Sequence, residues 1–596
     1  MREFSVPADI TVAPDATLSD AVFDAERDDP DRVMFRRKVA SSWQPVTAAS
    51  FARQVRRLAA GLMARGVESG DRIGLMSHTR YEWTLCDYAI WTAGAVTVPV
   101  YETSSAEQVA WILGDSGAVA VFVESDEHQA TVGEVVSELS ALRHVWKLEG
   151  GALEELAEAG GAVTDADVEQ RRKTPTPDTL ATVIYTSGTT GRPKGCELTH
   201  GNFLFDAATT TDGLRELFTE GASTLLFLPL AHVFARIIQV GCVLNRISMG
   251  HTSDVKNLLG DFAVFEPTFI LAVPRIFQKV YNGAQQKAHA GGKAQGVLFD
   301  QADRTAVAYS EQLQKGRVSP LTRAQHLAFD KVVYSRLRAV MGGKVAYAVS
   351  GGGPLGARLG HFFRGIGVTV LEGYGLTETT AGATCNLPDS IRVGSVGRPI
   401  PGETVRIADD GEILLRGENI FRGYWKNPEA TAQTLAGGWF HTGDIGELDD
   451  DGFLSITGRM KELIVTAGGK NVSPAVLEDR LRSHPLISQC IVVGDNKPFI
   501  ACLVTLDEDA LPAWKKEHDK QGLSRAALVN DPELRAEIQT AIDRANKAVS
   551  KAESIRKFTI LETDFSEEAG QMTPSLKLKR KVIMEEFATD VAGLYA

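Results

Sequence analysis

In the first half of the chain, short runs of β-branched residues alternate with segments that have the apolar spacing of helices. These runs predict buried strands at residues 73–76, 97–101 and 118–123. The intervening segments predict helices at residues 51–65, 82–93 and 106–116. Such alternation favours βαβ units, so the sequence predicts an α/β fold with parallel sheet. Further strands are predicted at residues 182–185, 224–228, 268–272, 345–349 and 368–371.

The pattern changes in the second half, and 596 residues are too many for a single core. Residues 278–340 are rich in Ala, Gln, Lys and Arg and predict helices outside the main domain. Residues 396–456 predict short strands of a small β-subdomain, and strands at 487–493 and 499–506 precede charged helices. We therefore predict a large N-terminal domain of parallel and mixed sheets with flanking helices, residues 1–458, and a smaller α+β C-terminal domain, residues 459–596.

Composition excludes several classes of protein. The chain has 63 basic and 76 acidic residues, a net charge of −13, so nucleic acid is not an expected partner. None of its six cysteines forms a C-x-x-C pair, which favours a reducing, cytoplasmic location. The first residues do not resemble a secretory signal, and no 18-residue apolar stretch occurs. Any contact with a membrane is therefore expected to be peripheral.

The strongest local motif is a loop of glycines, hydroxyls and one lysine directly after a predicted strand. Residues 185–195 read YTSGTTGRPKG. Glycines let backbone N–H groups turn toward an anion, while hydroxyls and Lys194 add donors for phosphate oxygens. The spacing does not match a Walker A loop. A surface turn without a ligand is the alternative interpretation.

Two further glycine-rich segments follow predicted strands, at residues 350–355 (SGGGPL) and 373–379 (GYGLTET). In open α/β sheets the ligand crevice lies at the carboxyl ends of strands. Tyr374 offers a ring face for a purine, and Glu378 is a hard oxygen ligand suited to Mg²⁺. Residues 438–446 and 458–462 add Asp444, whose carboxylate can accept both ribose hydroxyls, and Arg459. Taken alone, each motif also has a structural interpretation: the glycines can form an ordinary turn, Tyr374 can be a packing residue, and Glu378 and Asp444 can be solvated acids.

The order of these motifs carries a family resemblance. YTSGTTGRPKG, then YGLTET, then HTGD, then GRMKE resembles the adenylate-forming superfamily of acyl-CoA synthetases, luciferases and peptide-synthetase adenylation domains. The resemblance spans residues 45–585. Within it, GGWFHTGDIGELDDDGFLSITGRMKELIVTAGGKNVSPAVLE is similar to the fatty acyl-CoA synthetase signature, and TPSLKLKR and the helical insertion resemble the long-chain branch.

The resemblance implies a ligase that activates a fatty acid with ATP and Mg²⁺ as acyl-AMP and transfers the acyl group to coenzyme A. It implies that the C-terminal domain moves about a hinge at Lys461. The β- and γ-phosphates are assigned to Thr186, Ser187, Gly188, Thr189, Thr190 and Lys194. The adenine is assigned to Gly351, Gly352, Gly373 and Tyr374, and the α-phosphate to Thr377. Mg²⁺ is assigned to Glu378, and the ribose to Asp444 and Arg459. Lys577 matches the catalytic lysine, and His232 matches a residue that lines the acyl site.

Some interpretations stay open beside the resemblance. Without it, Lys577 is one more charge of a basic tail, and His232 is a capping or core histidine. Leu576 and Val465 depart from family patterns, and Arg236 stands where some relatives have an aromatic gate, so the acyl channel cannot be carried over. Loading of an acyl carrier protein is an alternative activity, and a non-catalytic nucleotide or lipid binder is another.

Overall fold

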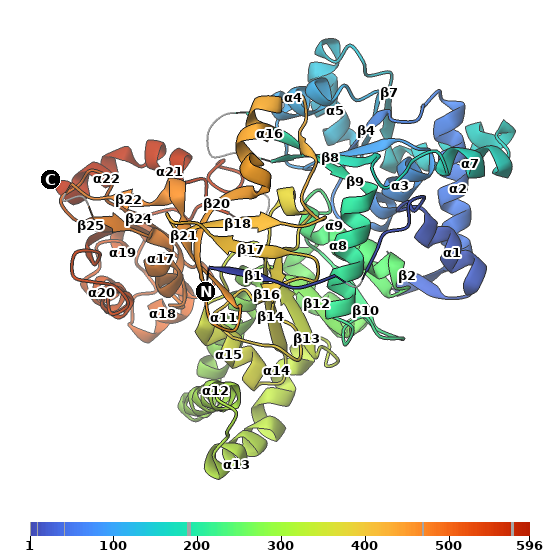
Figure 1. The fold of residues 1–596 in the computed structure, drawn as a ribbon. Helices are drawn as coiled ribbons and strands as arrows, with labels where there is room; N and C mark the ends of the chain where they lie inside the picture. The colour runs from blue at the N-terminus through green and yellow to red at the C-terminus, as the bar shows by residue number, and fades with distance from the viewer. Residues whose placement is uncertain (1, 9, 41, 187–191, 468–469, 574–576) are drawn as a thin grey trace.

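A computed structural model describes all residues except 1, 9, 41, 187–191, 468–469 and 574–576. The predicted α/β fold is confirmed. Figure 1 shows a large unit that contains most of the chain and, at one side of it, a smaller unit that contains the C-terminal residues. No helix among the described residues is long and apolar enough to cross a membrane.

The largest sheet has the strand order β19-β9-β8-β5-β4-β6-β7. Its bounds are β4 (Arg72–Met76), β5 (Val96–Val100), β6 (Ala120–Val123), β7 (His144–Lys147), β8 (Leu180–Thr186), β9 (Lys194–Thr199) and β19 (Gly423–Tyr424). Strands β4 to β8 pair in parallel, whereas β9 is antiparallel to both its neighbours. The connecting helices are α3 (Tyr81–Thr92) and α4 (Ala106–Ser116), as the βαβ pattern predicts. All twelve residues of α3 are buried, since the helix lies inside the core rather than on its surface.

Two more sheets complete the α/β part of the large unit. One contains β12 (Phe269–Ala272), β13 (Tyr347–Ser350), β14 (Thr369–Tyr374), β15 (Thr384–Cys385) and β16 (Arg398–Pro399) in that order. Its first three strands are parallel, and they lie within two residues of the predicted strands at their start. The other contains β10 (Ser223–Leu226), β11 (Ser248–His251), β2 (Val33–Val39) and β3 (Ser42–Thr47). The β2–β3 hairpin was not predicted.

The small β-subdomain is an antiparallel sheet with the order β1-β17-β18-β20-β21. Its strands are β1 (Glu3–Ser5), β17 (Thr404–Ile407), β18 (Glu412–Arg416), β20 (Phe440–Leu448) and β21 (Leu454–Arg459). The N-terminal strand β1 therefore joins a sheet whose other members come from 400 residues later in the chain.

The C-terminal unit has its own apolar core, formed by residues from Ile464 to Ile560. Its main sheet is β24 (Ile487–Val493), β25 (Ile500–Leu506) and β26 (Ile555–Ile560), with the small pair β22 (Ile464–Val465) and β23 (Asn471–Val472) beside it. Helices α17 (Pro474–Arg482) and α20 (Pro532–Asn546) pack on this core. The predicted domain boundary at residues 458 and 459 stays a prediction.

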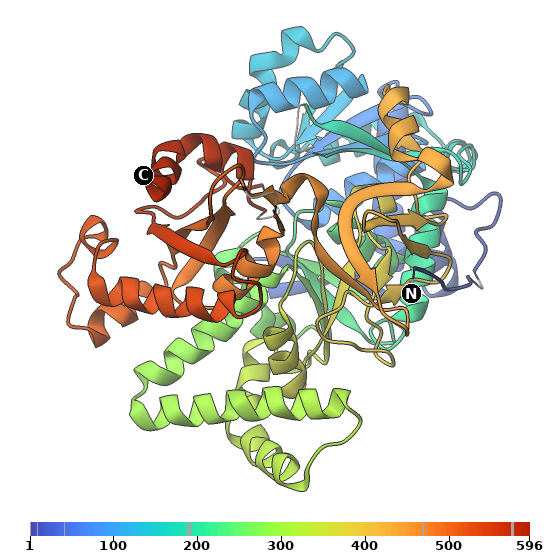
Figure 2. The ribbon, with the colours of Figure 1, turned by 60° about the vertical axis from the view of Figure 1, so that its left-hand side comes forward.

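The segment predicted to be helical outside the main domain forms a projecting bundle, visible at the bottom of Figures 1 and 2. It consists of α11 (Pro274–Ala290), α12 (Lys293–Gln314), α13 (Pro320–Phe329), a π-helical segment η5 (Asp330–Tyr334) and α14 (Ser335–Val340). Gly291 and Gly292 separate α11 from α12, as the sequence indicates. Helix α15 (Ala357–Gly365) packs against α12 and joins the bundle to β14.

Candidate active site

The ends of β8 and β9 hold the predicted phosphate loop. Thr186 is the last residue of β8 and pairs with Lys194, the first residue of β9. The predicted residues Ser187, Gly188, Thr189 and Thr190 lie outside the described part of the chain. The Lys194 ammonium lies 5.0 Å from the ring centre of Tyr424 in β19.

Tyr424 connects this hairpin to the next predicted motif. Its hydroxyl donates a hydrogen bond to Oε1 of Glu378 at 2.8 Å. Thr377 and Glu378 lie in a short 3-10 helix, η6 (Thr377–Thr379), which follows β14. One tyrosine therefore contacts both the lysine and the glutamate that sequence assigned to phosphate and Mg²⁺. Sequence analysis did not identify Tyr424, since a tyrosine in a two-residue strand has no pattern of its own.

Asp444 is buried and has two strong partners. The Tyr374 hydroxyl donates to its Oδ2 at 2.7 Å, and the Arg459 Nε–H donates to its Oδ1 at 2.7 Å. Asp444 and Arg459 are directly opposite each other on β20 and β21. Burial, and then the negative charge of Asp444, raise the pKa of Tyr374 well above its usual value, so its phenol stays protonated and donates. Tyr374, assigned to the adenine, therefore forms one hydrogen-bonded group with the two residues assigned to the ribose, Asp444 and Arg459.

The glycines after β13 and within β14 leave room where backbone and side chains approach closely. A Cβ atom on Gly351 would lie 2.8 Å from the Phe234 ring. Gly352 has a φ of +80°, which favours glycine. A Cβ atom on Gly373 would lie 3.1 Å from the Thr384 carbonyl oxygen. Phe234 is the second residue of α9 (Val233–Leu244), so the loop after β13 lies against the start of α9.

His232 caps that helix. Its Nδ1 accepts a hydrogen bond from the Phe234 N–H at 3.2 Å, which is the capping role that sequence left open. Burial, and then the positive charge of Lys577, lower the pKa of His232 to about 3. The imidazole is therefore neutral at physiological pH. Its assignment to the acyl site stays a prediction.

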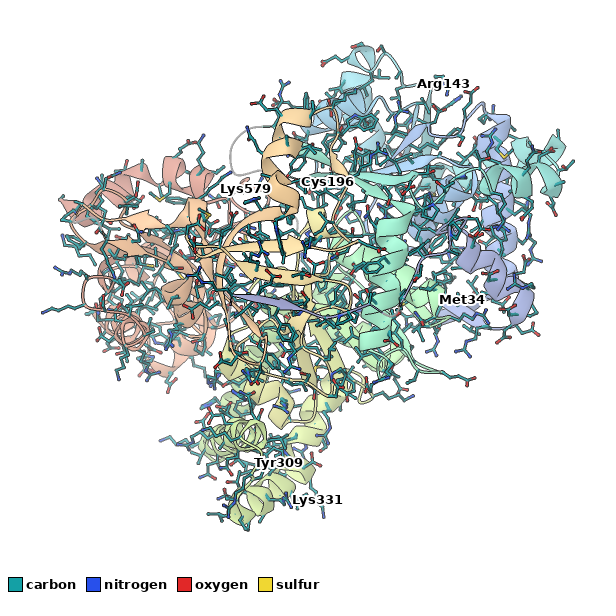
Figure 3. The ribbon with its side chains drawn as sticks, viewed as in Figure 1. Met34, Arg143, Cys196, Tyr309, Lys331 and Lys579 are labelled. Atoms are coloured by element: carbon teal, nitrogen blue, oxygen red, sulfur yellow. The ribbon has the colours of Figure 1, made fainter. Side chains whose placement is uncertain are left out.

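Lys577 comes from the far end of the sequence, yet its amine lies near residues of the predicted nucleotide site. Desolvation by protein atoms around its amine, and then the charge of Arg459, lower its pKa, whereas Asp444, Glu378 and Glu462 act in the opposite direction. The Lys577 backbone is held by Thr573, whose N–H donates to the Lys577 carbonyl oxygen at 2.8 Å. Figure 3 labels Lys579, two residues further on, and Cys196 of β9. The fold thus brings the predicted tail lysine to the predicted nucleotide residues.

Direct contacts hold the two units in this arrangement. Arg275 at the start of α11 donates to the Ser488 Oγ at 3.2 Å and lies 3.9 Å from the Asp564 carboxylate. The Thr103 hydroxyl donates to the Glu567 carboxylate. The predicted hinge residue, Lys461, is exposed in the 3-10 turn η8 (Met460–Glu462), between the core of the large unit and that of the C-terminal unit.

The residues present fit a divalent cation that is held mainly by a nucleotide. No group of three or more His, Cys, Asp or Glu side chains with ligand geometry occurs among the described residues. Glu378 is half-buried, and the Tyr424 hydroxyl contacts its Oε1. A single carboxylate combined with phosphate oxygens is the usual environment of Mg²⁺.

Arg236, which stands where some relatives have an aromatic gate, does not face a channel. Its side chain and that of Asp87 in α3 are fully buried. The Arg236 Nε donates to Asp87 Oδ2 at 2.9 Å, and its Nη1 donates to the Thr182 hydroxyl in β8 at 2.6 Å. The ion pair therefore joins α9 to α3, and the hydrogen bond to Thr182 joins α9 to β8, the strand that leads to the phosphate loop. Sequence analysis missed Asp87, since an acid within an apolar helix gives no sign of a partner 149 residues away.

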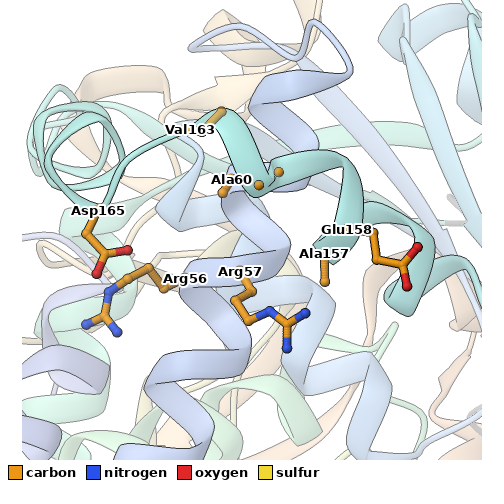
Figure 4. A pocket seen from close by; sticks show the side chains of 9 residues that line it. Arg56, Arg57, Ala60, Ala157, Glu158, Val163 and Asp165 are labelled. Carbon is orange, nitrogen blue, oxygen red and sulfur yellow. The ribbon is translucent and has the colours of Figure 1, made fainter.

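A surface hollow of about 350 Å³ lies elsewhere, between α2 (Ala48–Ala64) and the segment around α6 (Ala152–Ala159) (Figure 4). Arg56, Glu158 and Asp165 are among its lining residues. None of the predicted site residues lines it. The hollow is therefore separate from the candidate active site.

Comparison with known proteins gives matches over nearly the whole chain. A family model described as AMP-binding enzyme matches residues 22–425, and one described as AMP-binding enzyme C-terminal domain matches residues 461–596. The long-chain-fatty-acid–CoA ligase FadD15 of Mycobacterium tuberculosis is 51% identical over 599 residues, which cover 100% of both proteins. The long-chain-fatty-acid–CoA ligase ACSBG2 of Xenopus laevis is 30% identical and is matched over 99% of this chain and 85% of its own length.

Solved structures share the fold. The o-succinylbenzoate coenzyme A synthetase MenE of Bacillus subtilis, in complex with ATP and a magnesium ion, has a TM-score of 0.68 at 22% identity. The match covers 96% of this chain and 99% of that one. The A-PCP didomain of a carboxylic acid reductase from Segniliparus rugosus, in complex with AMP, has a TM-score of 0.73 at 20% identity, with coverage of 98% and 83%.

Proposed function

The chain belongs to the AMP-binding enzyme family, and from this premise we propose that it is a long-chain fatty acid–CoA ligase. The enzyme uses ATP to form an acyl-AMP with release of pyrophosphate, and then transfers the acyl group to the thiol of coenzyme A with release of AMP. The observation that carries the proposal is identity of 51% to a long-chain-fatty-acid–CoA ligase along the full length of both proteins. Nothing in the comparisons favours transfer to an acyl carrier protein.

The residues around Asp444 support a role in holding the nucleotide. The Asp444 carboxylate has a fixed orientation because Tyr374 and Arg459 each donate to one of its oxygens. Ribose hydroxyls are donors, and a fixed carboxylate accepts them without the cost of ordering a side chain. The absence of side chains at Gly351 and Gly352 suits close approach of a planar base to the backbone there.

Lys194, Thr377 and Glu378 are proposed to bind the phosphates, with Glu378 as the protein ligand of Mg²⁺. A bound Mg²⁺ supplies charge neutralisation to the phosphate oxygens. In the first step the fatty-acid carboxylate attacks the α-phosphorus and pyrophosphate leaves, so negative charge develops on phosphate oxygens. The Lys577 ammonium is proposed to stabilise that charge, since electrostatic positioning is the main contribution of proteins to phosphoryl transfer.

The second step needs different groups beside the same carbonyl, because the thiol attacks the acyl-AMP carbonyl and AMP leaves. A rotation of the C-terminal unit about Lys461 withdraws Lys577 and presents another face of that unit. The contacts of Arg275 and Thr103 with this unit are polar, which supports a reversible arrangement. Six buried free cysteines suit a reducing compartment, so we expect the enzyme to act in the cytoplasm.

A pyrophosphate-release assay across acids from acetate to long-chain fatty acids tests this function. We expect kcat/KM to rise roughly four-fold for each added CH₂ while the chain is being buried, since one CH₂ contributes ~0.8 kcal/mol. Coenzyme A should support AMP release, and acyl carrier protein should not. Maximal activity with acetate, or activity with acyl carrier protein alone, would contradict the proposal.

A further inference from the structure

Residues 315–344 form the tip of the projecting helical bundle, and we call them the basic arm. They comprise the end of the turn after α12, then α13, η5 and α14. They contain seven Lys and Arg residues and one acid, Asp330, so they carry a charge of +6. The whole chain carries −13, so the remainder carries −19. Thirty residues with this charge bias are a local anion-attracting surface on an acidic protein.

The inner face of the basic arm is well packed. Tyr334 is fully buried, and its hydroxyl donates to the Ala302 carbonyl oxygen at 2.7 Å. The ring of His326 stacks on Tyr309 at 3.8 Å, and its Nε2 lies 2.6 Å from the Gly365 carbonyl oxygen. These contacts fix the orientation of α13 against α12 and α15, so the opposite face is presented in a defined way.

The outer face combines apolar and cationic side chains. Leu321, Leu327 and Val332 are 69%, 61% and 47% exposed. Leu321, Ala324, Ala328 and Val332 recur at intervals of three or four residues, which is one face of a helix. The exposed cations that make no ion pair with any described residue are Lys315, Arg317, Arg323, Lys331 and Arg336.

Helices with an exposed apolar face flanked by lysine and arginine are typical of proteins that lie in the interfacial layer of an anionic bilayer. The arm projects from the bottom of the molecule in Figure 2, and Figure 3 shows Lys331 near its tip. Because the arm projects from the rest of the molecule, its leucines can enter a lipid surface while the cations face the headgroups. Nucleic acid would satisfy the cations and leave the leucines in water.

We propose that the basic arm docks the protein on an anionic lipid bilayer, through Leu321, Leu327 and Val332 as apolar contacts and the surrounding cations as headgroup contacts. Docking of this kind goes beyond the reaction itself. It would keep the enzyme at the phase into which a long-chain fatty acid partitions.

Sedimentation of the full chain with vesicles tests the proposal. We expect binding to vesicles that contain phosphatidylglycerol, weak binding to pure phosphatidylcholine, and loss of binding at high salt. The double variant Arg323→Glu and Lys331→Glu should bind more weakly by about five-fold for each charge removed. Leu321→Glu with Leu327→Glu should also weaken binding. All variants should keep wild-type pyrophosphate release with a water-soluble acid, which shows that they are folded.

Matched substitutions elsewhere control for charge and exposure. Val136→Glu replaces an apolar residue that is 46% exposed outside the bundle, and Lys551→Glu reverses an exposed charge in the C-terminal unit. Both should bind vesicles as the wild type does. Equal vesicle binding by the arm variants and the wild type would overturn the proposal. Loss of self-association or of DNA binding in the arm variants, without any effect on vesicle binding, would do so as well.

An independent observation concerns the turn after Glu378. Thr380 and Ala381 have φ values of +56° and +99°, a region that residues with a side chain rarely occupy. Such strain persists only where neighbouring groups hold it, and it is common at functional sites. Here the neighbour is Asn419, whose side chain is fully buried. Its Nδ2 donates to the Gly382 carbonyl oxygen at 2.6 Å, and the Thr380 hydroxyl donates to the Asn419 carbonyl oxygen at 2.6 Å.

The amide oxygen of Asn419 faces a second buried group, the carboxyl of Glu403. A Cβ atom on Gly417 would lie 2.1 Å from Glu403 Oε2 and 2.4 Å from Asn419 Oδ1, so both oxygens border the same point. The Glu403 carboxylate oxygen and the Asn419 amide oxygen are both acceptors, so no hydrogen bond can form between them unless the Glu403 carboxyl is protonated. Burial raises the pKa of Glu403 well above its usual value, which favours the neutral carboxyl, and a neutral carboxyl can donate toward the Asn419 oxygen. The amide nitrogen of Asn419 is then left to hold the turn.

We propose that Asn419 is a positioning residue for Glu378, and this proposal rests on the Mg²⁺ role of Glu378 given above. Asn419→Asp replaces the donor with an acceptor. It should raise the Mg²⁺ concentration for half-maximal ATP–pyrophosphate exchange by about ten-fold or more, as loss of an outer-layer partner of a metal ligand does. Glu403→Gln keeps a donor toward Asn419, so its Mg²⁺ requirement should stay that of the wild type.

A purely structural role for Asn419 would lower the unfolding temperature without changing the Mg²⁺ requirement, and that result would overturn the proposal. A raised Mg²⁺ requirement in Glu403→Gln would overturn the role given to the Glu403 proton. If Glu378→Gln has the Mg²⁺ requirement of the wild type, the assignment of Glu378 itself fails instead.

Discussion

Replacing Lys577 by alanine should slow acyl-adenylate formation by ~100-fold or more, the loss typical for one group that stabilises developing charge. Thioester formation from supplied acyl-AMP should stay close to the wild-type rate, since Lys577 is withdrawn for that step. The two half-reactions are measured separately, by pyrophosphate exchange and by single-turnover transfer to coenzyme A. The physical reason is the position of the lysine, whose charge is felt by Glu378, Asp444 and His232 in the present arrangement.

Lys581→Ala is the matched control, because Lys581 belongs to the same basic tail and its side chain is 75% exposed. It should leave both half-reactions unchanged. A comparable loss of both half-reactions in Lys577→Ala would contradict a rotating C-terminal unit.

The lowered pKa of Lys577 gives the same prediction a pH dependence. The amine is charged below its pKa, so adenylation should decline on the alkaline side at a lower pH than an ordinary lysine would give. The thiol of coenzyme A ionises with a pKa of about 8.5, so transfer from supplied acyl-AMP should increase over the same range. Opposite trends of the two half-reactions are the expected result.

Replacing Arg236 by methionine should lower the free energy of unfolding of the large unit by about 3–5 kcal/mol, because it leaves a buried carboxylate without its partner. Asp87 then keeps only hydrogen bonds from neutral groups such as Gln239 and Thr97. The guanidinium also lies 5.2 Å from the Trp91 ring centre, so tryptophan fluorescence during urea unfolding reports on this site.

The double variant Asp87→Leu with Arg236→Met distinguishes the cost of a lone charge from the loss of packing. Removing both charges should recover a large part of the lost stability, since replacement of a buried ion pair by apolar groups is often neutral. Equal destabilisation in the single and double variants would show that packing, not charge, decides the effect.

Long apolar segments were predictable from sequence because burial on both faces leaves a continuous pattern. Residues 487–493 form β24 with every residue buried, as predicted. The hairpin of β2 and β3 was missed, because VMFRRKV and SWQPVT show no regular alternation of apolar and polar residues. The other strands of their sheet lie about 200 residues away. Strand pairings of that separation leave no local signal.

The residues of the candidate site likewise fall into those that sequence could identify and those that it could not. The family resemblance assigns Asp444, Arg459, Tyr374 and Lys577 to one site, and the structure brings them close together. Tyr424, Asn419 and Asp87 could not be found, since each acts through a hydrogen bond to a residue on another element. Partners of that kind are defined by the folded chain rather than by residue type.

The buried state of all six cysteines has a practical consequence. Thiol-directed dyes should leave the native cysteines unmodified, so the wild-type sequence can serve directly as a background for labelling. Thr103 and Glu567 touch across the two units here. Cysteines introduced at these two positions would carry a donor and an acceptor fluorophore, and single-molecule energy transfer between them would follow each opening and closing during turnover.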